Sequence, residues 1–296
     1  MRRRDVMITA AASLAFAPAF SAAAKPFMSL GYSPSRVVTF AELMRGMTPV
    51  HIAADLRRIA PLTNGIRTYT TDLGIDAALP AAKALGLKVS VGFGLGSDKA
   101  LNEAEIARGL KVVAAHAAII ERVYVGNETL QRKELNPSEL AGYVRRVRGA
   151  IANTAIKVGT GEAWHDWLKA PEVAAESDFI GAHLYPYWDG VPIEASVDYV
   201  ARRFAELRSA YPGKPVIISE TGWPSAGPTH QAAVPSLENQ ERFIAAFLPR
   251  AAKERWDFSF FEAYDQPWKG QEREIGVGPH WGLFDGLRPK VAIAKV

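Results

Sequence analysis

The sequence predicts an α/β protein built as a single (β/α)8 TIM barrel. Short apolar runs alternate along the chain with stretches whose apolar residues recur three and four positions apart, as strands and amphipathic helices do in repeated βα units. Eight such apolar runs are present, which is the number of strands in this closed barrel. The length of 296 residues is also close to the roughly 250 residues that the fold takes.

The expected strands are short and mostly apolar, as strands covered on both faces by helices are. In chain order they are residues 27–32, 65–69, 88–93, 122–126, 156–159, 179–184, 216–220 and 258–264. An open dinucleotide-binding sheet is disfavoured, because no G-x-G-x-x-G follows the first strand. The glycine-rich stretch VGFGLGSDK at 91–99 has no lysine-serine ending, so we do not expect a phosphate loop there.

Amphipathic helices are expected between the strands. The clearest helical stretches are residues 49–61, 102–119, 137–153, 194–211 and 238–255. Two of them begin with a capping signal: Asn102 precedes Glu103 and Glu105, and Asn136 precedes Pro137 with Glu139 three residues on. An asparagine before an acidic first turn favours a helix start, so we expect helices to begin at both positions.

Residues 1–24 differ from the rest and are typical of an export signal. They have a basic start, an apolar stretch and the small-residue ending Ala22-Ala23-Ala24, which fits an A-x-A cleavage pattern. Arg3-Arg4 resembles a twin-arginine signal, although arginines occur in ordinary signals too. We therefore expect a mature domain of residues 25–296 in the periplasm or outside the cell, with the export route left open.

The composition excludes several classes of function. The chain has no cysteine, which rules out disulfides, thiolate catalysis and cysteine metal sites. The net charge is +4, of which half comes from the basic start, and no basic block remains in the mature chain, so nucleic acid is not an expected partner. No later apolar run is long enough for a membrane span. We expect a monomer without a metal or cofactor.

Acidic and aromatic residues gather at the ends of the expected strands. These strand-end residues are Arg67, Tyr69, Asp72, Phe93, Asn127, Glu128, Glu162, Trp164, His183, Tyr185, Tyr187, Trp188, Glu220, Trp223, Glu262, Asp265, Trp268 and Lys269. The carboxyl ends of barrel strands form the active-site face. Aromatic rings suit the C–H faces of sugars, and carboxylates and amides hydrogen-bond their hydroxyls. A carbohydrate is therefore the expected ligand.

Two of the acids are placed for glycoside hydrolysis. Glu128 ends the fourth expected strand and Glu220 ends the seventh, so the two stand on opposite sides of the ring. Glycosidases use one protonated carboxyl and one ionised carboxylate that flank the scissile bond. Glu128 follows Asn127, whose amide can bind the sugar hydroxyl beside the reacting carbon. We therefore expect Glu128 to be the acid/base and Glu220 the nucleophile.

The two glutamates lie in distinctive stretches: VIISETGWPSAG contains Glu220, and VYVGNE contains Glu128. These stretches resemble the nucleophile signature and the acid/base strand of glycoside hydrolase family 17, the β-1,3-glucanase and β-1,3-glucanosyltransferase family, and in particular its short bacterial members. Further matches are GYSP at 31–34, IRTYTTD at 66–72, HLYPYW at 183–188, ENQ at 238–240, FEAYDQPWK at 261–269 and HWGLFD at 280–285.

The resemblance implies a retaining (β/α)8 barrel enzyme that acts on β-1,3-glucan or laminari-oligosaccharides by double displacement. By resemblance the family's substrate contacts fall on Tyr69, Asn127, Tyr185, Trp223 and Lys269. Together with the other strand-end residues, the expected substrate-binding set is Tyr69, Asp72, Phe93, Asn127, Glu162, His183, Tyr185, Tyr187, Trp223, Glu262, Gln266, Trp268 and Lys269.

One position departs from the family pattern. Gln266 stands where many members have a glutamate before Pro-Trp-Lys. A neutral residue near the pair of glutamates leaves the acid/base with one fewer negative neighbour, which lowers its pKa. We therefore expect an optimum at lower pH than in those members.

Several alternatives stay open at this level. Glu128 could cap a helix, Tyr69 could belong to the barrel core and Trp223 could serve rim packing alone. His183 could ligate zinc, although the other histidines show no ligand spacing with it. A noncatalytic glucan-binding periplasmic protein and a retaining enzyme for another β-glucan are the alternative functions. Hydrolysis and transfer, exo and endo action, and the length of the glucan are not distinguished.

Overall fold

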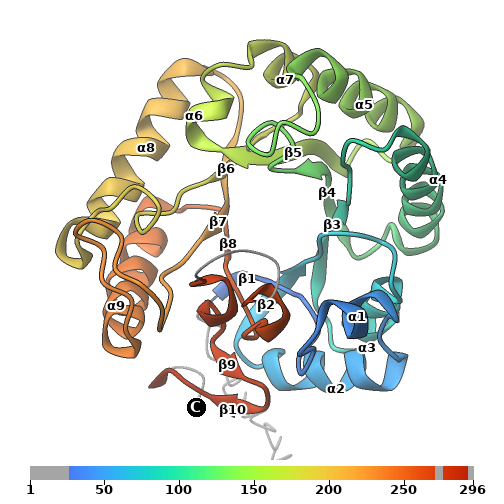
Figure 1. Cartoon of the computed structure of the whole chain (residues 1–296). Helices are drawn as coiled ribbons and strands as arrows, with labels where there is room; N and C mark the ends of the chain where they lie inside the picture. The colour runs from blue at the N-terminus through green and yellow to red at the C-terminus, as the bar shows by residue number, and fades with distance from the viewer. Residues whose placement is uncertain (1–26, 271–275, 293–296) are drawn as a thin grey trace, which may run out of the picture.

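Eight parallel strands close into a barrel in chain order, β1 to β8, and helices surround it (Figure 1). The computed structural model describes residues 27–270 and 276–292, and the expected export signal at 1–24 lies outside them. The strands are β1 (Phe27–Gly31), β2 (Thr63–Arg67), β3 (Lys88–Phe93), β4 (Ile120–Asn127), β5 (Lys157–Ala163), β6 (Ile180–His183), β7 (Val216–Thr221) and β8 (Phe258–Phe260). The predicted (β/α)8 fold is confirmed.

The helices form the outer ring in Figure 1. They are α1 (Phe40–Met44), α2 (Pro49–Ile59), α3 (Ala78–Ala84), α4 (Lys99–His116), α5 (Pro137–Ala150), α6 (Trp164–Trp167), α7 (Pro171–Glu176), α8 (Ser196–Ala210) and α9 (Leu237–Glu254). Short 3-10 turns are η1 (Ile75–Ala77), η2 (Ile193–Ala195), η3 (Pro267–Gly270) and η4 (Gly278–His280), and a small hairpin joins β9 (Phe284–Asp285) to β10 (Arg288–Pro289). Apolar residues of helices and strands form one main core between the two layers.

One of the two predicted helix starts is correct. Asn136 caps α5 and forms a reciprocal capping box with Glu139, which satisfies otherwise unpaired N–H groups of the first turn. The prediction for Asn102 is wrong, because α4 begins earlier and is capped by Asp98. Asn102 is instead a buried residue within the helix, and its side chain bonds both the N–H and the carbonyl of Gly96. It therefore fixes the loop after β3.

The eighth strand is shorter than predicted because the end of the chain folds back onto it. The expected strand 258–264 ends at Phe260, and the following residues pair with residues 281–284. The N–H of Glu262 donates to the carbonyl of Trp281, and the N–H of Phe284 donates to the carbonyl of Ala263. This segment lies at the carboxyl end of the barrel and brings Trp281 beside the site.

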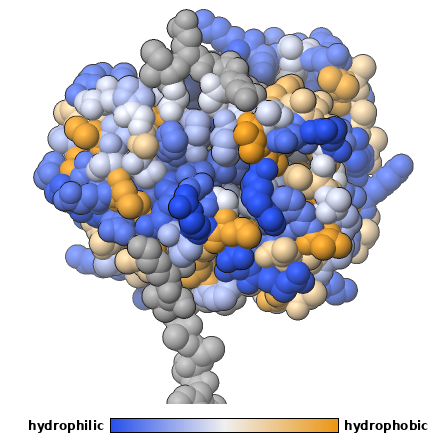
Figure 2. All heavy atoms as spheres, turned by 60° about the horizontal axis from the view of Figure 1, so that its bottom comes forward, coloured by the Kyte–Doolittle hydropathy of each residue, from blue (hydrophilic) through white to orange (hydrophobic). Residues whose placement is uncertain are grey.

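The surface of the described residues mixes polar and apolar side chains. On the face that Figure 2 shows, hydrophobic residues are scattered among hydrophilic ones rather than gathered in one patch. Within residues 27–270 and 276–292, no helix combines the length and the apolar character that crossing a membrane requires.

The close packing of neighbouring strands gives a first prediction. A Cβ on Gly181 of β6 would overlap the carbonyl oxygen of Thr160 on β5, so Gly181→Ala should lower the free energy of unfolding by about 1–3 kcal/mol, as overpacking does. Gly142 of α5 is the control, because a Cβ there meets nothing within 4 Å. Gly142→Ala should stabilise the helix by roughly 0.5–1 kcal/mol. Urea denaturation of both variants measures the difference, and equal midpoints would contradict this account of the barrel wall.

Candidate active site

Glu220 lies at the carboxyl end of β7 and is almost fully buried. Its Oε1 accepts a hydrogen bond of 2.7 Å from the guanidinium of Arg67. Its Oε2 accepts a hydrogen bond of 2.7 Å from the Tyr185 hydroxyl. Because one oxygen has a donor at the end of β2 and the other has a donor in the segment after β6, the carboxylate is fixed in one orientation at the mouth of the barrel.

Arg67 is the cation around which the site is built. It ends β2 and is completely buried, and its guanidinium also donates to the carbonyl of Ser219 at 2.8 Å and to Oδ1 of Asn127 at 2.6 Å. Burial lowers the pKa of Arg67, but the charge of Glu220 outweighs this and raises that pKa above its usual range. Arg67 was expected at a strand end, but its role was not predicted. A charged residue inside the apolar run before Tyr69 is the feature of the sequence that could have indicated a buried ion pair.

Glu128 follows β4 and has a left-handed backbone, with φ of 53°. The turns that follow it do not form a helix, so the helix-cap interpretation is wrong. Its Oε1 lies 2.7 Å from Nδ1 of His183. One oxygen of Glu128, one oxygen of Glu220 and a ring nitrogen of His183 lie within 4.8 Å of one another. The two glutamates expected to act together are therefore neighbours across the mouth of the barrel.

The pKa of Glu128 is set by two opposing effects. Burial raises it, but the hydrogen bond and charge of His183, together with the charges of Arg132 and Arg67, outweigh burial, so the pKa of Glu128 is held below its usual range. The expected cause, Gln266, is not involved. Gln266 is fully buried, and its amide donates to the carbonyls of Ser33, Pro34 and Tyr264. The lowered pKa of Glu128 therefore comes mainly from the imidazole, with a smaller effect of the two arginines.

The two glutamates line a cleft that has two lobes. The first lobe has a volume of about 760 Å³ and the second of about 420 Å³. Glu128 lines both lobes, whereas Glu220 lines the first. The first lobe includes Tyr69, Asn127, Phe261, Trp268 and Lys269, and the second includes Trp164, His183, Tyr185 and Trp188. Glu128 thus stands at the boundary between two ligand-sized spaces.

The first lobe contains the polar groups that could hold a sugar. The buried hydroxyl of Tyr69 has no hydrogen-bond partner among the described residues, and the residue lines the cleft rather than the core alone. Lys269 donates to Oε1 of Glu262 at 2.8 Å, and its ammonium lies 4.6 Å from the centre of the Phe261 ring. Burial raises the pKa of Glu262 to about 7, against the lowering effect of Lys269.

Two tryptophans, Trp164 and Trp188, line the second lobe. Both were expected at strand ends, but neither was in the expected binding set. Trp188 is 54% exposed. Trp164 lies with its ring 3.9 Å from the guanidinium carbon of Arg203, and its indole N–H donates to Asp189. An aromatic ring fixed in this way offers a flat surface to a sugar.

Several residues of the expected binding set do not line either lobe of the cleft. Phe93 packs against Gly109 in the core. Trp223 is fully buried, packs against Phe243 and donates to the carbonyl of Val234, which is the rim-packing alternative. Gln266 is likewise fully buried, and its amide bonds backbone carbonyls.

Three further expected contacts serve neighbouring loops. Asp72 pairs with Arg108 of α4. The buried Tyr187 donates from its hydroxyl to the carbonyl of Pro228. Glu162 is buried, and its carboxylate accepts hydrogen bonds from Thr129. Burial raises the pKa of Glu162 to about 7, while the charge of His183 and the hydrogen bonds from Thr129 lower it.

The grouping of Glu128, His183 and Glu220 resembles a set of metal ligands. However, the Arg67 guanidinium bonds Glu220 at 2.7 Å and lies 3.4 Å from Nε2 of His183. A fixed positive charge at that distance opposes a second cation. The donor set therefore suits an ion pair and a proton-bearing imidazole better than a bound metal.

Comparison with known proteins identifies the family. Residues 33–282 match the BtgE/BtgC glycoside hydrolase domain. The chain belongs to this family. The resemblance to glycoside hydrolase family 17 is likewise confirmed, because the crystal structure of a family 17 β-1,3-glucanosyltransferase from Rhizomucor miehei is 29% identical, with a TM-score of 0.80 over 90% of this chain and 97% of that one. A mutant of that enzyme in complex with laminaritriose is similar to the same degree.

Fungal relatives carry related names. The glucan 1,3-beta-glucosidase of Schizosaccharomyces pombe is 29% identical over 246 residues, which cover 78% of this chain and 76% of the relative. The putative glucan endo-1,3-beta-glucosidase btgC of Aspergillus niger is 26% identical over 292 residues. The match covers 89% of this chain but 42% of btgC, so this family member corresponds to about two fifths of the Aspergillus protein.

The buried ion pair gives a second prediction. Arg67→Met should lower the free energy of unfolding by about 3–5 kcal/mol, because it leaves the Glu220 carboxylate buried without its cation. The double variant Arg67→Met/Glu220→Gln should regain part of this loss. Arg146→Met is the control, since its pair with Glu103 is exposed and should change stability by less than about 1 kcal/mol. Chemical denaturation measures all three, and a stable single variant would contradict the prediction.

Proposed function

We propose that this protein is a retaining glycoside hydrolase or transglycosylase that acts on β-1,3-glucan, with Glu220 as nucleophile and Glu128 as acid/base. The observation that carries the proposal is the proximity of the two carboxylates: one oxygen of each lies within 4.8 Å of the other. Retaining enzymes separate their carboxyl groups by about 5–5.5 Å, whereas inverting enzymes need several ångströms more for a water molecule.

In the first step Glu220 attacks the anomeric carbon of the sugar in the first lobe. A glycosyl ester forms on Glu220, the glycosidic C–O bond breaks, and the proton of Glu128 passes to the leaving oxygen. Arg67 and Tyr185 hold the attacking carboxylate in place before substrate arrives, so little reorientation is needed.

In the second step Glu128 acts as a base. It removes a proton from a water or a sugar hydroxyl in the second lobe, whose oxygen attacks the anomeric carbon and releases Glu220 with the original configuration. The position of Glu128 between the lobes supports this double use.

Transfer to a sugar is supported by a specific feature, the pair of tryptophans in the second lobe. An exposed ring such as Trp188 stabilises a bound acceptor sugar, which competes with water for the ester. The similar Rhizomucor miehei enzyme is named a glucanosyltransferase. We therefore propose transfer alongside hydrolysis.

The substrate class is supported by the relatives, whose names contain β-1,3-glucan activities. A noncatalytic glucan-binding protein would gain nothing from two carboxylates that converge to within 4.8 Å of each other. We also propose export to the periplasm or the medium, on the pattern of residues 1–24.

The decisive experiment is incubation with laminari-oligosaccharides, followed by mass analysis of the products over time. Glu220→Ala should reduce turnover by several orders of magnitude, because the ester can no longer form. The variant should also be less stable, since Arg67 loses its buried partner, so circular dichroism must show that it is folded at the assay temperature. Glu103→Ala, at an exposed glutamate of α4, is the control and should behave as the parent protein. Products longer than the substrate indicate transfer, and only shorter products indicate hydrolysis. Unchanged substrate, or an active Glu220→Ala variant, would refute the proposal.

The hydrogen bond from His183 predicts a change in pH dependence. His183→Phe removes the largest of the effects that lower the pKa of Glu128, whereas burial, which raises that pKa, stays. Glu128 should then keep its proton to higher pH, so the alkaline limb of the kcat/KM profile should move upward. His116→Asn, at the end of α4, is the control and should leave the profile in place. A downward shift with His183→Phe would contradict the assignment of Glu128 as the acid.

A further inference from the structure

The turn that carries Glu128 is hydrogen-bonded to a buried glutamate of the neighbouring strand β5. Glu162 lies on β5 and is fully buried. Its Oε1 accepts hydrogen bonds of 3.0 Å from both the N–H and the hydroxyl of Thr129, and its Oε2 accepts one of 3.2 Å from the N–H of Leu130. The two residues that follow Glu128 are thus fixed by one side chain.

The backbone of Glu128 requires such support. Its φ of 53° costs a residue with a Cβ about 1–2 kcal/mol, and strained conformations of this kind persist only where the surroundings determine them. The β4–β5 register also shifts between Tyr124 and Asn127, and irregularities of this type re-aim side chains next to active sites. The N–H of Glu128 itself donates to the carbonyl of Gly161 at 2.7 Å. Residues 161 and 162 of β5 therefore hold the turn together.

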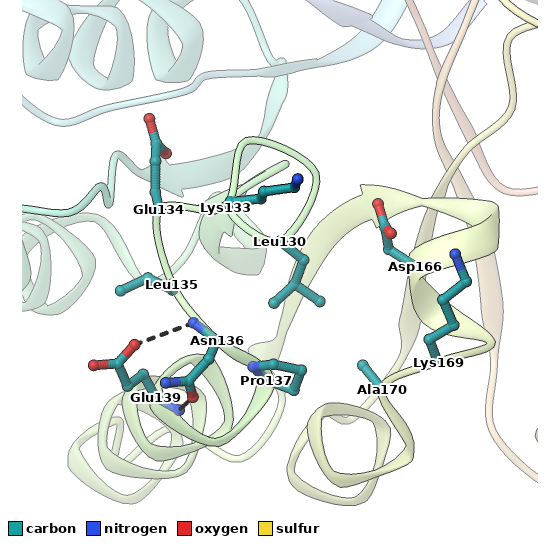
Figure 3. Close-up of a pocket in the computed structure, with 10 residues that line it drawn as sticks. All are labelled: Leu130, Lys133, Glu134, Leu135, Asn136, Pro137, Glu139, Asp166, Lys169 and Ala170. Atoms are coloured by element: carbon teal, nitrogen blue, oxygen red, sulfur yellow. Dashed lines mark hydrogen bonds between the residues drawn. The ribbon is translucent and has the colours of Figure 1, made fainter.

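The outer side of the same turn has weaker support. Figure 3 shows the side chain of Leu130 beside a hollow of about 510 Å³, which Pro137 and Ala170 also line. The turn is closed on itself by the N–H of Glu134, which donates to the carbonyl of Thr129. Leu130 also packs against the main core, so this contact and the bonds to Glu162 together fix where the turn, and with it Glu128, stands.

We propose that Glu162 is a positioning residue that fixes the acid/base Glu128 through residues 129 and 130. This inference rests on the proposed function. Glu162 makes no contact with the cleft in either lobe, so its effect reaches the reaction only through the placement of the Glu128 carboxyl. Glutamine cannot replace it, because three donors meet its two oxygens and an NH2 group would face an N–H.

The test compares two substrates that differ in their need for an acid. Laminari-oligosaccharides need a proton on the leaving oxygen, whereas a 2,4-dinitrophenyl β-laminaribioside does not. Glu162→Gln should lower kcat on the oligosaccharide about 100-fold, the loss expected for a misplacement of about 1 Å, with KM little changed. Azide should restore turnover of the dinitrophenyl glycoside by this variant. Azide needs no base to attack the glycosyl ester on Glu220, and the product is the glycosyl azide. Glu128→Ala should show the same pattern in a stronger form.

Two further variants keep the test decisive. Thr129→Val removes one donor to Glu162 and should show the same pattern with a smaller loss, which covers the case in which Glu162→Gln does not fold. Ile156→Ala, in the buried approach to β5, should lower stability without separating the two substrates. Equal loss on both substrates, or no loss, in Glu162→Gln or Thr129→Val would overturn the positioning role alone. If Glu128→Ala shows no azide rescue while the parent enzyme is active, the proposed function fails and the inference fails with it.

Discussion

The ion pair between Arg67 and Glu220 is the constraint on which the rest of the site depends. Both groups are buried, and a buried charge is tolerated only when partners replace the water it has lost. Arg67 meets this requirement by reaching from β2 to the carbonyl and side chain of β7 and to Asn127 of β4. These contacts cross the barrel, so the geometry of the site and the closure of the strands stabilise each other.

Around this pair the two glutamates have different surroundings, and different roles follow from that difference. Glu220 has a cation and a phenol as its partners, which suits a carboxylate that attacks. Glu128 has an imidazole, an opening to both lobes of the cleft and a strained backbone supported by Glu162. A group that must release and recover a proton needs this kind of adjustable environment. The barrel supplies it by bringing β4, β5 and β6 together at one edge.

Much of the site could be predicted because strand ends are a local property of the chain. Glu128, Asn127 and Glu220 follow apolar runs, and all three lie at the mouth of the barrel. The expected residues that do not line the cleft have a feature in common. Phe93, Trp223 and Gln266 also lie near strand ends, but their side chains turn into the core, and adjacency in sequence does not say to which side a residue points. Arg67 was undervalued because its partners are 60 and more residues away.

By itself the sequence determined the alternation of strands and helices, their order and the motif positions of the two glutamates, because periodicity and capping act over a few neighbouring residues. Only the tertiary structure decided what surrounds those glutamates. The pKa of Glu128 is lowered by His183, which lies 55 residues away in the chain, and the turn that presents Glu128 is held by Glu162 from the adjacent strand. Electrostatic effects of this kind depend on distances in space, which exist only after the barrel has closed.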